Sequence, residues 1–296
     1  MLELTTTGDG TAATVTGDLP PQDLRRLIDA KPAHLFLNAG GVDDLSFLPQ
    51  LPLRTLDLVR VAPGTPITPV NFLTGLVQLN LGVSYSGELK ANGLVSLEVC
   101  GIEWGAGAES IAECPRLRHV KVSGYKGVDL ALFTALPNLA VLEVSNARRL
   151  SRLDDLASTN LRGLGLYYCT QLTTLAGVPV NGPLVSLDAQ TCTKVTDWHL
   201  LAEAPVLRYV ALQNVGSVPS ILPFQQLAAQ LEFFWFPENT NIIDGRVHWL
   251  ADVPTLRATG FKNRRHYDAT NDEVEAAIVL RHGAATWYPP TLDALS

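Results

Sequence analysis

The sequence predicts an α/β solenoid, with a curved, parallel β-sheet on the concave side and short helices or turns on the convex side. Three observations carry this prediction. A Leu-x-x-ϕ-x-ϕ pattern, where ϕ is apolar with one Thr and one Ala exception, returns ten times in 296 residues, and neighbouring copies start 18 to 25 residues apart. Each copy alternates apolar and polar residues with the period of a strand. A fixed period in the twenties is typical of repeats that bury their apolar faces by stacking.

A degenerate copy with Pro32 in the first position precedes the ten full ones. The full copies begin at Leu53, Leu76, Leu94, Leu117, Leu139, Leu161, Leu184, Leu207, Leu231 and Leu256. Together they predict about eleven parallel strands in one elongated repeat domain, residues 32–261.

The segments between the strands place apolar residues three and four apart, as in VDLALFTALP and VTDWHLLAEAP, which indicates short helices or helical turns. Prolines close several of these segments two residues before the next Leu, and proline disfavours helix in the residue ahead of it. Pro115, Pro137, Pro205 and Pro254 occupy this position. Strand, turn and helix repeated in one direction require parallel neighbours.

Both ends of the solenoid need a cap, because a terminal repeat would otherwise expose apolar surface. Residues 1–31 offer Thr-rich extended segments and a helix opened by Pro21. Residues 262–296 offer a helix over 271–282, with Asn271 as its expected cap and Gly283 after it. The tail that follows is expected to pack on the last repeat.

Charge and cysteine content narrow the classes of partner and compartment. The net charge is −7 and the chain has no long Lys/Arg-rich run, which argues against nucleic-acid binding and favours a basic protein partner. We find no secretory signal and no membrane-length apolar run. The four cysteines stand singly, so we expect reduced, unpaired and buried thiols in a cytoplasmic protein that is monomeric on its own.

These repeats resemble the leucine-rich-repeat family over residues 32–261. Cys169 and Cys192 stand three residues after the last strand position, where the family often places an inward Asn or Cys. The run from Cys192 to Leu212 is similar to the cysteine-containing subtype, known from the substrate-binding parts of F-box-type ubiquitin-ligase receptors. We see no F-box-like helical segment before the repeats, so only the repeat type carries over.

Motifs for catalysis, metal binding or cofactor binding do not stand out. The six histidines form no His-x-x-x-His pair or His-Glu-x-x-His box, and no phosphate loop or Gly-x-Ser-x-Gly elbow occurs. We therefore expect no catalytic residues, no metal and no cofactor.

The strand residue between the last two apolar positions is expected to lie at the middle of the concave face. In chain order this central row reads Phe36, Asp57, Asn80, Glu98, Lys121, Glu143, Gly165, Asp188, Ala211, Trp235 and Gly260. Four carboxylates and one basic residue allow two interpretations: a solvated sheet whose charges neutralise one another, or an electrostatic template for a partner.

Aromatic residues on outward or edge positions favour the second interpretation, since Tyr and Trp are enriched in binding hot spots. The expected partner-binding residues are Asp57, Glu98, Glu143, Tyr167, Tyr168, Asp188, Gln190, Tyr209, Gln213, Phe233, Trp235 and Glu238. The C-terminal tail, which carries Trp287 and Tyr288, is an alternative cover for some of them.

The sequence thus favours a non-catalytic protein-binding module that recognises one basic protein on its concave face. An inhibitor such as an immunity protein, acting on a cationic toxin or nuclease, is the specific hypothesis. The alternatives are a recognition subunit of an effector or enzyme complex, and a carbohydrate or small-ligand receptor.

Overall fold

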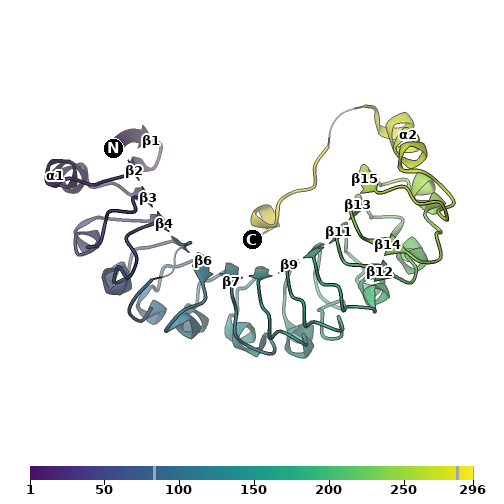
Figure 1. The fold of residues 1–296 in the computed structure, drawn as a ribbon, viewed down its shortest axis with the longest axis horizontal. Helices are drawn as coiled ribbons and strands as arrows, with labels where there is room; N and C mark the ends of the chain where they lie inside the picture. The colour runs from purple at the N-terminus through teal and green to yellow at the C-terminus, as the bar shows by residue number, and fades with distance from the viewer. Residues whose placement is uncertain (83–84, 285–286, 296) are drawn as a thin grey trace. The chain divides into compact units, whose positions relative to one another are not determined.

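The computed structural model describes residues 1–82, 85–284 and 287–295. The chain forms two compact units. The first comprises residues 1–123 and 135–138, and the second comprises residues 124–134 and 139–296. In each unit the strands stand side by side in chain order (Figure 1).

The first unit opens with an antiparallel hairpin of two strands. The second strand of this hairpin pairs in parallel with the first strand of the repeats. Residue-by-residue pairing keeps the same motif positions in register from strand to strand, apart from a shift at Leu37/Asn38. The strands are β1 (Leu2–Thr7), β2 (Gly10–Thr16), β3 (His34–Asn38), β4 (Thr55–Arg60), β5 (Gln78–Leu81), β6 (Val99–Glu103) and β7 (His119–Ser123).

The second unit holds six parallel strands of the main sheet and a separate short parallel pair. The main strands are β8 (Val141–Ser145), β9 (Gly163–Tyr167), β10 (Ser186–Gln190), β11 (Tyr209–Gln213), β13 (Phe233–Phe236) and β15 (Ala258–Phe261). The short pair is β12 (Ser217–Val218) and β14 (Asn241–Ile242). Among the described residues the repeats contribute five strands to the first unit and six to the second, which confirms the predicted eleven.

Most returns between the repeat strands contain a 3-10 helix rather than a longer α-helix, and the return from β9 to β10 consists of turns. A 3-10 helix has three residues per turn and occurs in short pieces, which suits these short returns. The 3-10 helices of the returns are η1 (Leu48–Gln50), η2 (Thr68–Phe72), η3 (Ala91–Gly93), η4 (Ala108–Glu113), η5 (Ala131–Ala135), η6 (Asp154–Ser158), η7 (Trp198–Glu203), η8 (Leu222–Leu227) and η9 (His248–Asp252).

Each repeat sends its motif residues into the space between strand and 3-10 helix. Leu161, Leu164 and Leu166 are buried, and the residues between them lie on the opposite side of the strand. We call this opposite side the sheet face; it is the side predicted to be concave. Fixed inward positions therefore fix which side chains each repeat presents on the sheet face.

One repeat uses a different frame from the predicted one. Strand β6 faces inward with Cys100 and Ile102, and its register pairs Gly101 with Asn80 and Lys121. The repeat therefore starts at Leu97 instead of Leu94. Glu98 lies before the strand, outside the central row, and pairs with Arg118 at 2.9 Å. The run LVSLEVCGI fits both frames, and the Leu97 frame keeps even spacing to both neighbouring strands.

Each terminal segment that the sequence predicts to be a cap contains an α-helix. Helix α1 (Pro21–Ala30) follows the N-terminal hairpin, and helix α2 (Asn271–His282) follows β15. Thr270, not Asn271, caps α2, in a reciprocal capping box with Glu273. The Asn271 side chain instead accepts a hydrogen bond from the Phe261 amide at 2.9 Å.

The four cysteines are buried and unpaired within the described residues, as predicted. Cys169 and Cys192 occupy the same slot in neighbouring repeats, and their thiols point at the carbonyls of Val144 and Leu166, at 3.8 and 3.4 Å. Burial raises the pKa of the Cys100 and Cys114 thiols. In the described part of the chain no helix combines the length and apolar character needed to cross a membrane.

Candidate functional site

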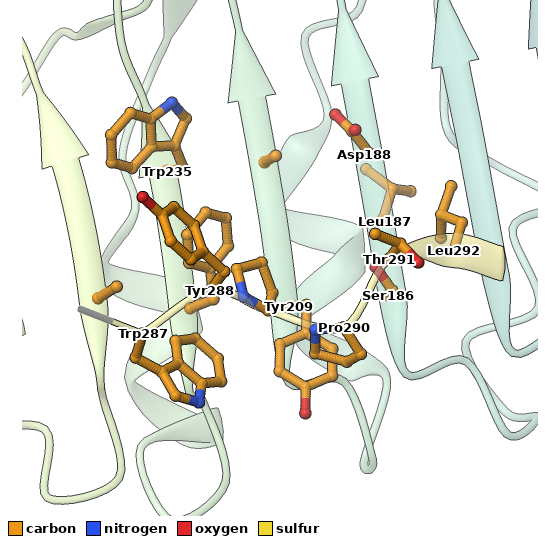
Figure 2. A pocket seen from close by; sticks show the side chains of 14 residues that line it. Ser186, Leu187, Asp188, Tyr209, Trp235, Trp287, Tyr288, Pro290, Thr291 and Leu292 are labelled. Carbon is orange, nitrogen blue, oxygen red and sulfur yellow. The ribbon is translucent and has the colours of Figure 1, made fainter. Parts of the chain in front are cut away.

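The candidate site is a cavity of about 560 Å³ between the sheet face of the second unit and the C-terminal tail, residues 287–295 (Figure 2). The tail crosses the sheet face and ends in a 3-10 helix, η10 (Leu292–Leu295), against β8 and β9. This path corrects the expectation that the tail packs on the last repeat. The lining residues are Ser186, Leu187, Asp188, Tyr209, Ala211, Phe233, Trp235 and Ala258 from the sheet, and Trp287, Tyr288, Pro289, Pro290, Thr291 and Leu292 from the tail.

Two leucine side chains of the tail, Leu292 and Leu295, pack against Gly163 of β9. Leu295 is 5% exposed. A Cβ atom built on Gly163 would lie 2.8 Å from Leu292 Cδ2 and 3.3 Å from Leu295 Cδ1. A glycine inside a strand often marks such a close approach. Gly163 therefore gives η10 the space to lie directly on β9.

Aromatic rings form the walls of the cavity. Phe233 and Trp235 lie parallel on β13, with ring centroids 5.9 Å apart and planes 4° apart. Trp287 of the tail contacts Tyr209 and Phe233, at centroid distances of 6.1 and 6.4 Å. Trp235 leans over Gly260, where a Cβ atom would meet its ring at 2.1 Å. The tail thus covers part of the aromatic surface and adds rings of its own.

A carboxylate stands at the other side of the cavity. Asp188 Oδ2 accepts a hydrogen bond from the Tyr167 hydroxyl at 3.1 Å, and the Tyr167 ring lies over Gly165. Burial raises the pKa of the Asp188 carboxyl, the Tyr167 hydrogen bond opposes this, and the nearby Glu143 adds to it. Burial and the same two carboxylates raise the pKa of Tyr167 well above its ordinary range.

This arrangement predicts that Asp188→Asn stabilises the free protein at neutral pH. Because folding raises the Asp188 pKa, the ionised carboxylate destabilises the native state at pH values above that raised pKa. The effect diminishes as the pH falls from the raised pKa toward 3.8, the ordinary value, and is absent well below 3.8, where both states are protonated. Thermal unfolding across this range should show a higher Tm for the variant at pH 7 and equal values near the acid end.

The exposed Glu203 on η7 offers the matched control. Glu203→Gln should leave the Tm unchanged, since this side chain is solvated. A lower Tm for Asp188→Asn at pH 7 would contradict the stated role of burial at Asp188.

The structure brings together six of the predicted site residues: Asp188, Tyr209, Phe233 and Trp235 line the cavity, Tyr167 contacts Asp188, and Glu143 lies beside Tyr167 at Gly165. Glu143 lies two strands from Asp188, on the far side of Gly165. Asp57 is on β4 of the first unit, half-buried. Glu98 also belongs to the first unit. It lies outside the central row, because its repeat starts at Leu97 and Gly101 takes the central position.

The remaining predicted residues lie where strands end. Tyr168 directly follows β9 and Glu238 stands two residues after β13, both in left-handed backbone with φ of 57° and 60°. Tyr168 is 45% exposed, and its amide donates to the Gln190 carbonyl of the next repeat. Gln213 donates to Glu238 at 2.9 Å. These side chains form the rim of the sheet and line no part of the cavity.

Sequence reasoning placed Ala211 and Gly260 in the central row but assigned no role in the site to them or to Gly163. Gly163, Ala211 and Gly260 leave room for the tail, for the hollow of the cavity and for the Trp235 ring, respectively. The strand GLGLY carries two glycines, and glycine is unfavourable inside a strand unless another group approaches closely. This pair of glycines was the sequence signal that could have indicated the close contact.

Solved structures with the same architecture identify the fold. The chain is similar to an internalin, InlF, from Listeria monocytogenes, with a TM-score of 0.59 and 18% identity over 91% of this chain and 84% of that one. It is also similar to a leucine-rich-repeat protein from Leptospira interrogans, with a TM-score of 0.51 and 17% identity over 86% of this chain and 61% of that one. The sequence matches no family model and no curated protein. The fold is that of the leucine-rich-repeat solenoid.

Proposed function

We propose that this chain is a non-catalytic protein-binding module that recognises one basic protein through the sheet face of its second unit. The observation that carries the proposal is the cavity itself, where aromatic side chains stand beside a carboxylate. Buried aromatic anchors surrounded by polar residues are typical of protein hot spots.

Charge supports a basic partner. The net charge is −7, and the central row of the second unit carries Glu143 and Asp188. Acidic surfaces speed the encounter with cationic proteins, whereas the aromatic contacts determine how slowly the complex dissociates. An inhibitor of a cationic protein, of the immunity type, is the specific role we propose. Four buried free thiols support a reducing, cytoplasmic compartment.

The test compares proteins from the native host lysate retained by wild type and by the double variant Trp235→Ala/Asp188→Ala. We expect a basic protein to be retained by wild type and lost from the double variant. Kinetics of the purified pair should show that Trp235→Ala costs about 2 kcal/mol or more, mainly through faster dissociation, and that Asp188→Ala mainly slows association.

Phe72→Ala is the matched control, since Phe72 is 66% exposed on η2 of the first unit. This variant should retain the same protein as wild type. Equal retention by wild type and by the double variant would mean that the sheet face of the second unit is not the binding site.

A further inference from the structure

We propose that the cavity between the tail and the sheet face binds an arginine side chain of the partner, with the guanidinium at Asp188 and the aliphatic stem on the aromatic rings. This inference rests on the proposed function, because it names the group by which a basic partner is recognised. It follows from the spacing, the ring chemistry and the charge of the cavity.

The spacing of the strands creates a hollow of the right width. Asp188, Ala211 and Trp235 are register partners on three adjacent strands, so the outer two stand about 10 Å apart at roughly 4.8 Å per strand. Ala211 offers only a methyl group at the floor between them. Trp235 leans away from the hollow, over Gly260. Figure 2 shows the Asp188 carboxylate and the Trp235 ring on opposite sides of this floor, with Tyr288 of the tail beside Trp235.

The rings suit the stem and the charge of a cationic side chain. Aromatic faces attract cations and also pack against methylene groups. The Tyr209 hydroxyl already donates a hydrogen bond to Glu232 Oε2 at 3.3 Å, and Glu232 also pairs with Arg208 at 3.0 Å. Tyr209 therefore offers a ligand its ring rather than its hydroxyl. The volume of about 560 Å³ falls in the range of about 300–1,000 Å³ that is usual for ligand sites.

The charge of the cavity is of one sign. The fourteen described residues that line it include one carboxylate, Asp188, and no Lys, Arg or His. Tyr167 donates to Oδ2 of that carboxylate, and no hydrogen bond to Oδ1 is found within the described residues. A carboxylate has about four acceptor sites, so it can still accept from a ligand.

A guanidinium fits this site better than an ammonium group does. It is planar, stacks on aromatic rings, is weakly hydrated and can present two N–H donors to one carboxylate. Burial of the Asp188 carboxylate is unfavourable in the free protein, and a cation in the hollow would relieve this cost.

The test titrates 15N-labelled protein with blocked arginine, Nα-acetyl-arginine methylamide, and with the blocked citrulline counterpart, which has the same shape and no charge. The readout is the indole N–H signals of Trp235 and Trp287, assigned with Trp→Phe variants. We expect the arginine probe to shift both signals and to bind at least tenfold more tightly than the citrulline probe. Asp188→Asn should remove most of that preference, Trp235→Leu should weaken both probes, and Phe72→Ala should change neither.

Equal binding of the two probes, no binding of either, or shifts confined to Trp104 or Trp249 would overturn the inference. Stronger binding of blocked lysine than of blocked arginine would overturn the choice of guanidinium. These results are separable from the proposed function. If the double variant loses its protein partner while blocked arginine shows no advantage over citrulline, only the present inference fails.

Discussion

Replacing Phe234 with alanine is expected to lower the free energy of unfolding by about 3–5 kcal/mol, the usual cost of deleting a buried phenylalanine. Phe234 is 0% exposed. Its ring packs between Phe224 of η8 and Phe236 of the same strand, with centroid distances of 4.9 and 5.5 Å. Because each repeat is stabilised by its neighbours, a cavity here should weaken the stacking of the adjacent repeats as well.

Trp235, the next residue, is the matched control because it points to the opposite side of the strand. It is 37% exposed, and its removal should cost about 1 kcal/mol of stability through the lost ring contact with Phe233. Urea unfolding followed by circular dichroism should therefore separate the two variants by several kcal/mol. Similar losses from both would contradict the assignment of Phe234 to the core and of Trp235 to the sheet face.

Such alternation is the part of the fold that a single sequence predicts well. A strand side chain points either inward or outward, so one apolar frame fixes every position of the sheet face. The central row was predicted correctly wherever the repeat had a single reading. It was wrong at Glu98, because LVSLEVCGI offers apolar residues in two frames and only packing against β5 and β7 selects one.

The candidate site could be predicted only in part, for a different physical reason. The acidic and aromatic residues of β10, β11 and β13 follow from repeat phase. The tail has no repeat phase, and its seat on Gly163 joins positions far apart in the sequence. Such a contact depends on shape complementarity between side chains, which periodicity does not encode. For this reason the sequence allowed the tail as a cover for the aromatic residues but placed it on the last repeat.

Replacing Gly163 with phenylalanine is expected to lift the tail from the sheet face and to weaken binding of blocked arginine by about tenfold or more. A large side chain at this position would occupy the space of Leu292 and Leu295. The repeats themselves should stay folded, because Gly163 projects toward the sheet face and aromatic residues are favourable in strands. Without the tail, Trp287 and Tyr288 would no longer wall the cavity.

Gly163→Ala provides the matched control. The nearest atoms to its added Cβ are the ends of flexible leucine side chains and Val141 Cγ2, at 2.8 to 3.4 Å, so small rotations can accommodate it. Acrylamide quenching of Trp287 fluorescence, measured with the other tryptophans replaced by phenylalanine, should rise for Gly163→Phe and stay near wild type for Gly163→Ala. A chain ending at residue 284 should match Gly163→Phe in its arginine affinity, since both remove the same wall. Unchanged quenching in Gly163→Phe would mean that the tail does not pack on β9. If the shortened chain binds blocked arginine as tightly as wild type, the tail is no part of the site and the sheet face alone recognises the cation.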